Sequence, residues 1–216
     1  MAGGREYYAE NYPAYEQQNS AAKLDFYMQL VRGRAPQGAD LFELGVGMGN
    51  FIARASAEYR CTGSEVNDYG LSEARRRAPT ANLLAGSWEQ IPIERPPTVV
   101  VAWDVLEHLP DLDAALACVR ARLASPGYLI AVVPVYDGPL GGLVRALDRD
   151  PTHLSKWPRA AWLEALQRHR FSVVDWGGIV RRLVFGRFYL HVTQPRPFLR
   201  RVGSAIWFVA GTGPTR

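Results

Sequence analysis

Short apolar segments recur along the chain, and their composition predicts strands. They are rich in Val, Leu, Ile and Ala, and the longest runs, TVVVAW and YLIAVV, are apolar throughout. Strands of this kind are typical of a parallel sheet that is covered on both faces. The predicted strands are residues 39–44, 59–66, 81–86, 96–104, 128–135, 171–176 and 204–212.

Helical periodicity fills most of the gaps between these segments. In the first predicted helix, the apolar residues Leu24, Tyr27, Met28 and Val31 share one face. The predicted helices are residues 20–31, 48–59, 68–78, 111–125 and 158–170. Strands and helices that alternate in this way predict an α/β fold, a doubly wound seven-stranded sheet, mostly parallel, with helices on both faces.

Composition and charge narrow the class of protein. The 216 residues are 48% hydrophobic with a formal charge of +4, which suits one globular domain. Nucleic-acid binders usually gather their charge into a dense patch, so we expect no nucleic-acid partner. Cys61 and Cys118 are too few for a zinc site or a disulfide scaffold. The first residues lack the apolar run of a secretory signal, and no run is long enough to span a bilayer, so we expect a cytoplasmic protein without a membrane partner.

The segment LFELGVGMGNF joins the first predicted strand to the next helix. It contains an acid and three alternating glycines, namely Glu43, Gly45, Gly47 and Gly49. Glycines in such a turn allow positive φ and a close approach of the backbone to a ligand. The dinucleotide pattern GxGxxG would need a glycine at position 50, where this chain has Asn50. An acid ahead of the turn suits a ligand with a positive charge, such as an ammonium group, and does not suit a pyrophosphate.

This turn and four later motifs resemble those of the class I S-adenosylmethionine-dependent methyltransferases. The motifs follow the family's order over about residues 38–177, and they are FELGVGMGNF, GSEV, AGSWEQIP, AWDVLEHLPDLDAAL and RFSVVDW. The resemblance implies a Rossmann-like sheet, S-adenosyl-L-methionine as cofactor and S-adenosyl-L-homocysteine as product.

The resemblance also implies which residues meet the cofactor. The glycine turn would wrap its methionine end, and Glu65 would accept hydrogen bonds from both ribose hydroxyls. Ser87 stands where many relatives have Asp, so its hydroxyl or a backbone group would accept from the adenine amine, with Trp88 nearby. The expected cofactor-binding residues are Tyr12, Glu43, Gly45, Gly47, Gly49, Glu65, Val66, Ser87, Trp88, Trp103, Asp104 and His108.

Two histidines near the predicted strand ends are candidates for a catalytic base. Glu107 and His108 follow the fourth strand, and we expect them to order that loop rather than act as an acid–base pair. His153 lies between the fifth strand and the next helix, where these enzymes commonly contact substrate. We therefore predict His153 as the catalytic base, although a loop hydrogen bond is an equal alternative.

Two further segments are expected to recognise the acceptor. In similar enzymes an N-terminal segment closes over the cofactor, so residues 1–35 are predicted as a helical lid and residues 36–216 as the core. An insert near 136–157 would select the substrate. The predicted substrate-binding residues are Tyr7, Tyr8, Tyr136 and Trp157.

The leading hypothesis is a small-molecule methyltransferase that acts on an O or N nucleophile, with specialised metabolism as a candidate setting. It would be metal-independent, because no cluster of adjacent acids is apparent in the sequence, and it would be a monomer or homodimer. One alternative is a nucleic-acid or protein methyltransferase, but WDVL replaces the NPPY-like motif of base-amino methyltransferases. Another is a cofactor-binding relative with non-methylating chemistry.

Overall fold

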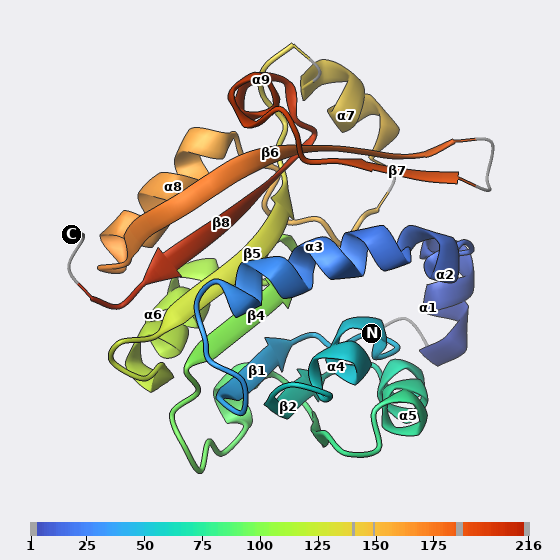
Figure 1. Ribbon diagram of the computed structural model, residues 1–216. Helices are drawn as coiled ribbons and strands as arrows, with labels where there is room; N and C mark the ends of the chain where they lie inside the picture. The colour runs from blue at the N-terminus through green and yellow to red at the C-terminus, as the bar shows by residue number, and fades with distance from the viewer. Residues whose placement is uncertain (1–3, 140, 149, 185–187, 214–216) are drawn as a thin grey trace.

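The strands form one mixed sheet in the computed structural model, which describes residues 4–139, 141–148, 150–184 and 188–213 (Figure 1). The strand order is β3-β2-β1-β4-β5-β8-β6-β7. The bounds are Asp40–Leu44 for β1, Arg60–Glu65 for β2, Asn82–Ala85 for β3, Val99–Trp103 for β4, Tyr128–Pro134 for β5, Ser172–Val184 for β6, Phe188–Val192 for β7 and Ala205–Gly211 for β8.

Parallel pairing dominates the sheet. Strands β1 to β5 pair only in parallel with one another, whereas β8 lies antiparallel between β5 and β6. Parallel neighbours need a crossover connection, and helices supply it here, as the strand–helix alternation predicts. The predicted α/β class and mostly parallel sheet are thus confirmed.

The predicted count of seven strands was wrong, because the described part of the chain contains eight. Strand β6 does not stop at Trp176 but continues to Val184, where it forms an antiparallel hairpin with β7. Gly177 and Gly178 interrupt the apolar pattern at this point. A Cβ at Gly177 would lie 2.6 Å from the Trp207 indole nitrogen, and one at Gly178 would overlap the Leu199 carbonyl. The two glycines therefore serve close packing within a continuous strand.

The helices are α1 (Gly4–Asn11), α2 (Tyr15–Gln18), α3 (Ala21–Arg32), α4 (Asn50–Ala55), α5 (Asp68–Arg77), α6 (Leu112–Arg122), α7 (Gly141–Leu147), α8 (Arg159–Arg168) and α9 (Arg196–Val202), with short 3₁₀ turns at Trp88–Gln90 and Leu106–His108. The five predicted helices are present, although α4 is shorter than predicted. Helices α7 and α9 were not predicted, since each is only two turns long and neither shows a clear apolar period.

Alternate residues of the buried strands face two separate hydrophobic clusters. Val99 and Val101 of β4 pack with α3, α4 and α5, whereas Val100 and Ala102 pack with α6 and α8. This alternation is the strand's period of two, with apolar residues on both faces because helices cover both. Helix α3 crosses one face of the sheet in Figure 1. Among the described residues, no helix is both long and apolar enough to cross a membrane.

The packing of α9 on β6 gives a first prediction. Gly178→Ala should lower the free energy of unfolding by about 1–3 kcal/mol, because the new methyl group overlaps the Leu199 carbonyl and α9 must shift. Urea denaturation followed by circular dichroism measures the change. Gly142→Ala in α7 is the matched control, since nothing lies within 4 Å of a Cβ there. Equal stability of the two variants would contradict the predicted overlap.

Candidate functional site

The glycine turn lies between β1 and α4, at the carboxyl end of the parallel strands. Gly47 has φ 56° and Gly49 has φ 86°, both in the left-handed region that favours glycine. A Cβ at Gly47 would lie 2.7 Å from the Tyr15 hydroxyl, and one at Gly49 would lie 2.7 Å from the Ala74 Cα. Neighbouring residues therefore pack directly against the backbone at both glycines, which leaves no room for a side chain. Open α/β sheets bind their ligands at this edge.

Two carboxylates converge at this turn. Glu65 ends β2, and its Oε2 accepts a hydrogen bond from the Gly47 N–H at 2.7 Å. Its Oε1 accepts from the N–H groups of Val66 and Asn67. Glu43 lies on β1, is 3% exposed, and its Oε2 has no hydrogen-bond partner among the described residues. Burial, together with the nearby Glu65, raises the pKa of the Glu43 carboxyl well above its usual range.

A buried carboxyl without a partner fits a cationic ligand better than an anionic one. Burying an unpaired charge is costly, so Glu43 takes up a proton unless a cation approaches it. An ammonium group would provide that cation and the missing hydrogen bonds. The residues at the turn thus fit the methionine end of the predicted cofactor.

The N-terminal tyrosines cover the turn. The Tyr15 hydroxyl accepts a hydrogen bond from the Met48 N–H at 3.0 Å, and burial raises the pKa of Tyr15 to about 12. The Tyr8 ring lies edge-on to that of Tyr15, with centroids 5.6 Å apart. Tyr7 and Tyr12 complete the cluster, with their ring centroids 5.8 Å apart. The structure thus brings Tyr7, Tyr8 and Tyr12, all predicted from the sequence, to the same place as the glycine turn.

The two tryptophans that were predicted to bind the cofactor lie in different surroundings. Trp88 is 4% exposed and packs edge-on against Phe42, with centroids 4.5 Å apart, so its ring belongs to the core. The Trp103 ring stacks on Tyr27 at 4.0 Å. Ser87 directly precedes the 3₁₀ turn at Trp88–Gln90. Cofactor contacts of these residues stay predictions.

Asp104 follows β4 with a positive φ of 58°, an uncommon conformation for a residue other than glycine. Its Oδ2 accepts a hydrogen bond from Arg181 Nη1 at 2.6 Å. Lys23 of α3 is also buried here, and burial lowers the pKa of its ammonium group to about 8. The sequence does not reveal Arg181 and Lys23 as site residues, because they come from β6 and α3 and no local motif links them to Asp104.

The loops after β4 and β5 bring the predicted His108, Tyr136 and His153 together. The His153 Nδ1 lies 3.0 Å from Asp148 Oδ2 and 3.1 Å from the Tyr136 hydroxyl. The ring centroids of His108 and His153 are 4.7 Å apart. Trp157 is placed differently, since its ring packs 5.0 Å from that of Trp162 in the core. The role of His153 as a base stays a prediction.

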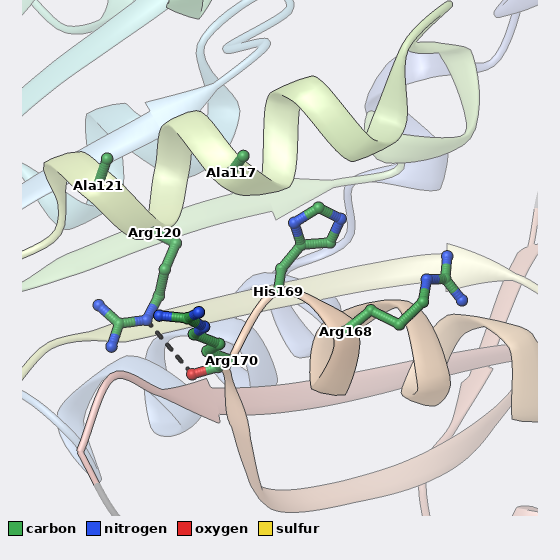
Figure 2. A pocket seen from close by; sticks show the side chains of 6 residues that line it. All are labelled: Ala117, Arg120, Ala121, Arg168, His169 and Arg170. Atoms are coloured by element: carbon green, nitrogen blue, oxygen red, sulfur yellow. Dashed lines mark hydrogen bonds between the residues drawn. The ribbon is translucent and has the colours of Figure 1, made fainter.

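A separate hollow of about 370 Å³ lies between α6 and the end of α8 (Figure 2). Arg120 and Arg170 line it, and the Arg120 Nε donates to the Arg170 carbonyl at 3.3 Å. His169, another lining residue, pairs with Asp113, as expected for a structural or surface histidine. Arg170 leads into the start of β6, so this hollow is at the amino end of that strand and not at the edge with the glycine turn.

Comparisons with known proteins agree with this arrangement. A family model described as a methyltransferase domain matches residues 15–175. An N,N-dimethyltransferase of dTDP-3-amino-3,4,6-trideoxy-alpha-D-glucopyranose from Streptomyces venezuelae is 29% identical over 173 residues, which cover 74% of this chain and 72% of that protein.

Solved structures share the fold. A S-adenosylmethionine-dependent methyltransferase from Thermotoga maritima superposes with a TM-score of 0.70 at 16% identity, covering 96% of this chain and 97% of that one. The magnesium protoporphyrin IX methyltransferase of Synechocystis, solved with bound S-adenosylhomocysteine, has a TM-score of 0.62 at 16% identity, covering 89% and 82%.

The buried acid at the turn gives a second prediction. Because the pKa of Glu43 is raised in the free protein, a bound cation should lower it and release a proton. Affinity for S-adenosylmethionine should therefore rise with pH above the ordinary glutamate range, until Glu43 is ionised in the free protein as well. Glu43→Gln should flatten this profile and weaken binding about tenfold to a hundredfold at neutral pH, as expected for a charged hydrogen bond.

Calorimetric titration in buffers with different heats of ionisation measures both the affinity and the released protons. Glu58→Gln is the control, since this glutamate pairs with Arg32 on the surface. An unchanged pH profile in Glu43→Gln would show that another group takes up the proton.

Proposed function

The chain belongs to the methyltransferase domain family, and from this premise we propose that it methylates a nitrogen or oxygen of a small molecule. It is a S-adenosylmethionine-dependent enzyme. The similarity to a dimethyltransferase of an amino sugar supports a small-molecule acceptor, and a nitrogen nucleophile in particular. The cytoplasmic location and the monomeric or homodimeric state stay predictions.

The observation that carries this proposal is the pair of carboxylates at the glycine turn. The unpartnered Glu43 supports a cationic ligand, whereas Glu65 stands at the end of the next strand and accepts from three backbone N–H groups. We assign Glu43 to the cofactor's ammonium group and Glu65 to its ribose hydroxyls. An anionic dinucleotide would place negative charge beside a buried acid, which is unfavourable.

Positioning and exclusion of water would supply most of the catalysis. When bound, the cofactor supplies a methyl group on a positively charged sulfur, which a nucleophile can displace in line. The chain's residues hold the two reactants in one orientation, which is worth on the order of 7–11 kcal/mol when the geometry is near ideal. Tyr8, Tyr12 and Tyr15 pack over the turn and would exclude water from it. A neutral amine needs no base before it attacks.

Within the predicted lid of residues 1–35, we assign α1 and α2 to the lid, because α3 packs in the hydrophobic core. We assign residues 36–216 to the core and residues 136–157 to acceptor selection. The support is the Tyr12 hydroxyl, which donates a hydrogen bond to Asp150 Oδ2 at 3.3 Å and so joins the first segment to the third. Tyr136 faces the same loop through its hydrogen bond to Asp148 at 2.6 Å. The acceptor would enter between these segments.

Calorimetry with the purified protein tests the proposal. S-adenosylmethionine and S-adenosylhomocysteine should bind, and NAD should not. Glu65→Ala should weaken both binders at least tenfold, as the loss of hydrogen bonds to a charged group does. A matched control is Glu58→Ala, whose side chain lies on the surface. Tight binding of NAD, or equal affinity in Glu65→Ala, would overturn the cofactor assignment.

Methyl transfer is then tested against a panel of amino-sugar nucleotides and aromatic alcohols. Mass spectrometry should detect a gain of one or two methyl groups on nitrogen or oxygen. Methylation of RNA or of a protein, with every small molecule inert, would refute the small-molecule acceptor while leaving the cofactor assignment intact.

A further inference from the structure

We propose that Glu107, His108 and His153 form a binding site for a divalent first-row transition metal ion, foremost Zn²⁺. One ligand atom of each of these residues lies within 4.8 Å of the others. Glu107 and His108 come from the loop after β4, whereas His153 comes from the loop after β5. The site lies beside Asp104, at the same sheet edge as the glycine turn. It does not depend on the proposed acceptor.

Glu107 is the strongest indication that a ligand belongs here. Its residue is 0% exposed, and neither carboxylate oxygen has a hydrogen-bond partner among the described residues. A buried carboxyl in this state is costly unless a proton or a cation satisfies it. The hydrogen bonds from the neighbouring loop reach only its backbone, where the Glu107 carbonyl accepts from the N–H groups of Leu154 and Ser155. The side chain is thus held in place but left without a partner.

Hydrogen bonds at Nδ1 leave Nε2 of both histidines as the nitrogen that can bind a metal. The His108 Nδ1 lies 2.8 Å from the Thr152 hydroxyl oxygen and 3.2 Å from the Thr152 carbonyl. Because the Thr152 hydroxyl donates its own proton to Asp150 Oδ1, both oxygens act as acceptors and Nδ1 carries the proton. The His153 Nδ1 lies 2.9 Å from Asp148 Oδ1, which fixes the same tautomer. In both rings the free lone pair is therefore on Nε2. Metal-binding histidines typically donate their other N–H to a carboxylate or carbonyl in this way.

Ligand chemistry selects the kind of ion. Imidazole nitrogens suit Zn²⁺ and other first-row transition metals, whereas Mg²⁺ and Ca²⁺ prefer oxygen ligands. Two histidines and one carboxylate also form the ligand set of known catalytic zinc sites, which keep one position open. Bonds of about 2.1 Å require the three ligand atoms to draw closer together than in the free protein. The open position can take water or an acceptor atom.

Asp148 and Asp150 add negative charge around the site. Asp150 Oδ2 lies 3.9 Å from the His153 Nε2 and also accepts from the Tyr12 hydroxyl. The Asp148 Oδ2 lies 2.8 Å from Lys156 Nζ, and this ion pair stabilises the loop. An ion on His153 Nε2 would leave this ring no free nitrogen, so the metal site would replace the role of His153 as a base. It would also replace the metal-independent site expected from the sequence.

Metal titration of the untagged, EDTA-treated protein tests the site. Zn²⁺ and Co²⁺ should bind at one ion per chain, and Mg²⁺ should bind far more weakly. The Co²⁺ complex should show visible ligand-field bands without the sulfur charge-transfer band that Cys61 or Cys118 would produce. Glu107→Gln and His153→Ala should each weaken binding at least tenfold. Asp148→Asn should weaken it about tenfold to a hundredfold, because the carboxylate that holds the His153 ring is lost.

His169→Ala is the matched control, because this histidine pairs with Asp113 outside the site. It should bind one ion with unchanged affinity. Circular dichroism confirms that Glu107→Gln, which keeps the size of the side chain, is folded. Absence of Zn²⁺ and Co²⁺ binding, or equal binding by the folded Glu107→Gln protein, would overturn the proposal. S-adenosylmethionine titration of the same sample separates this outcome from a failure of the methyltransferase assignment.

Discussion

The in-register parallel pairing of β1 with β2 and β4 determines where the chemistry of this protein lies. Glu43 of β1 stands opposite Gly63 of β2 and Val101 of β4. The strands therefore end side by side, and their last residues and the loops that follow meet at one edge. That edge holds Glu43, Glu65 and Asp104. A shift of one residue in any strand would turn its buried acid toward the opposite face of the sheet.

The acids at this edge, of which Glu43 and Glu107 are fully buried and Asp104 partly, differ in whether the protein itself neutralises them. Burial disfavours the charged form of Asp104, but Arg181 and Lys23 outweigh this effect and lower its pKa. Glu43 and Glu107 have no such partner in the described residues, and burial raises the pKa of both carboxyls. The positive charge that they lack can come from ligands. The same need for a positive charge therefore underlies both proposals, a cationic cofactor at Glu43 and a metal ion at Glu107.

The N-terminal segment and the loop after β5 close the site from two sides. Tyr15 reaches the turn through Met48, and Tyr12 reaches Asp150. Both contacts involve side-chain hydroxyls at the surface of the core, where a ligand or water could replace them. The β6–β7 hairpin adds a third boundary, since Arg181 extends from β6 to Asp104. Small domains of this kind can select substrates through added segments while the sheet stays unchanged.

The sequence by itself determined the α/β class, the parallel strands and the residues of the glycine turn, because these depend on local period and on short motifs. It also identified His108, Tyr136 and His153 as residues of interest. It did not predict the hairpin of β6 and β7, because two adjacent glycines, Gly177 and Gly178, suggest the end of a strand. Only the structure shows that they make room for Trp207 and Leu199. Nor did it link Glu107 to His153, or Asp104 to Arg181 and Lys23. Those groups are 46, 77 and 81 positions apart, and only the packing of the loops and helices at one sheet edge brings them together.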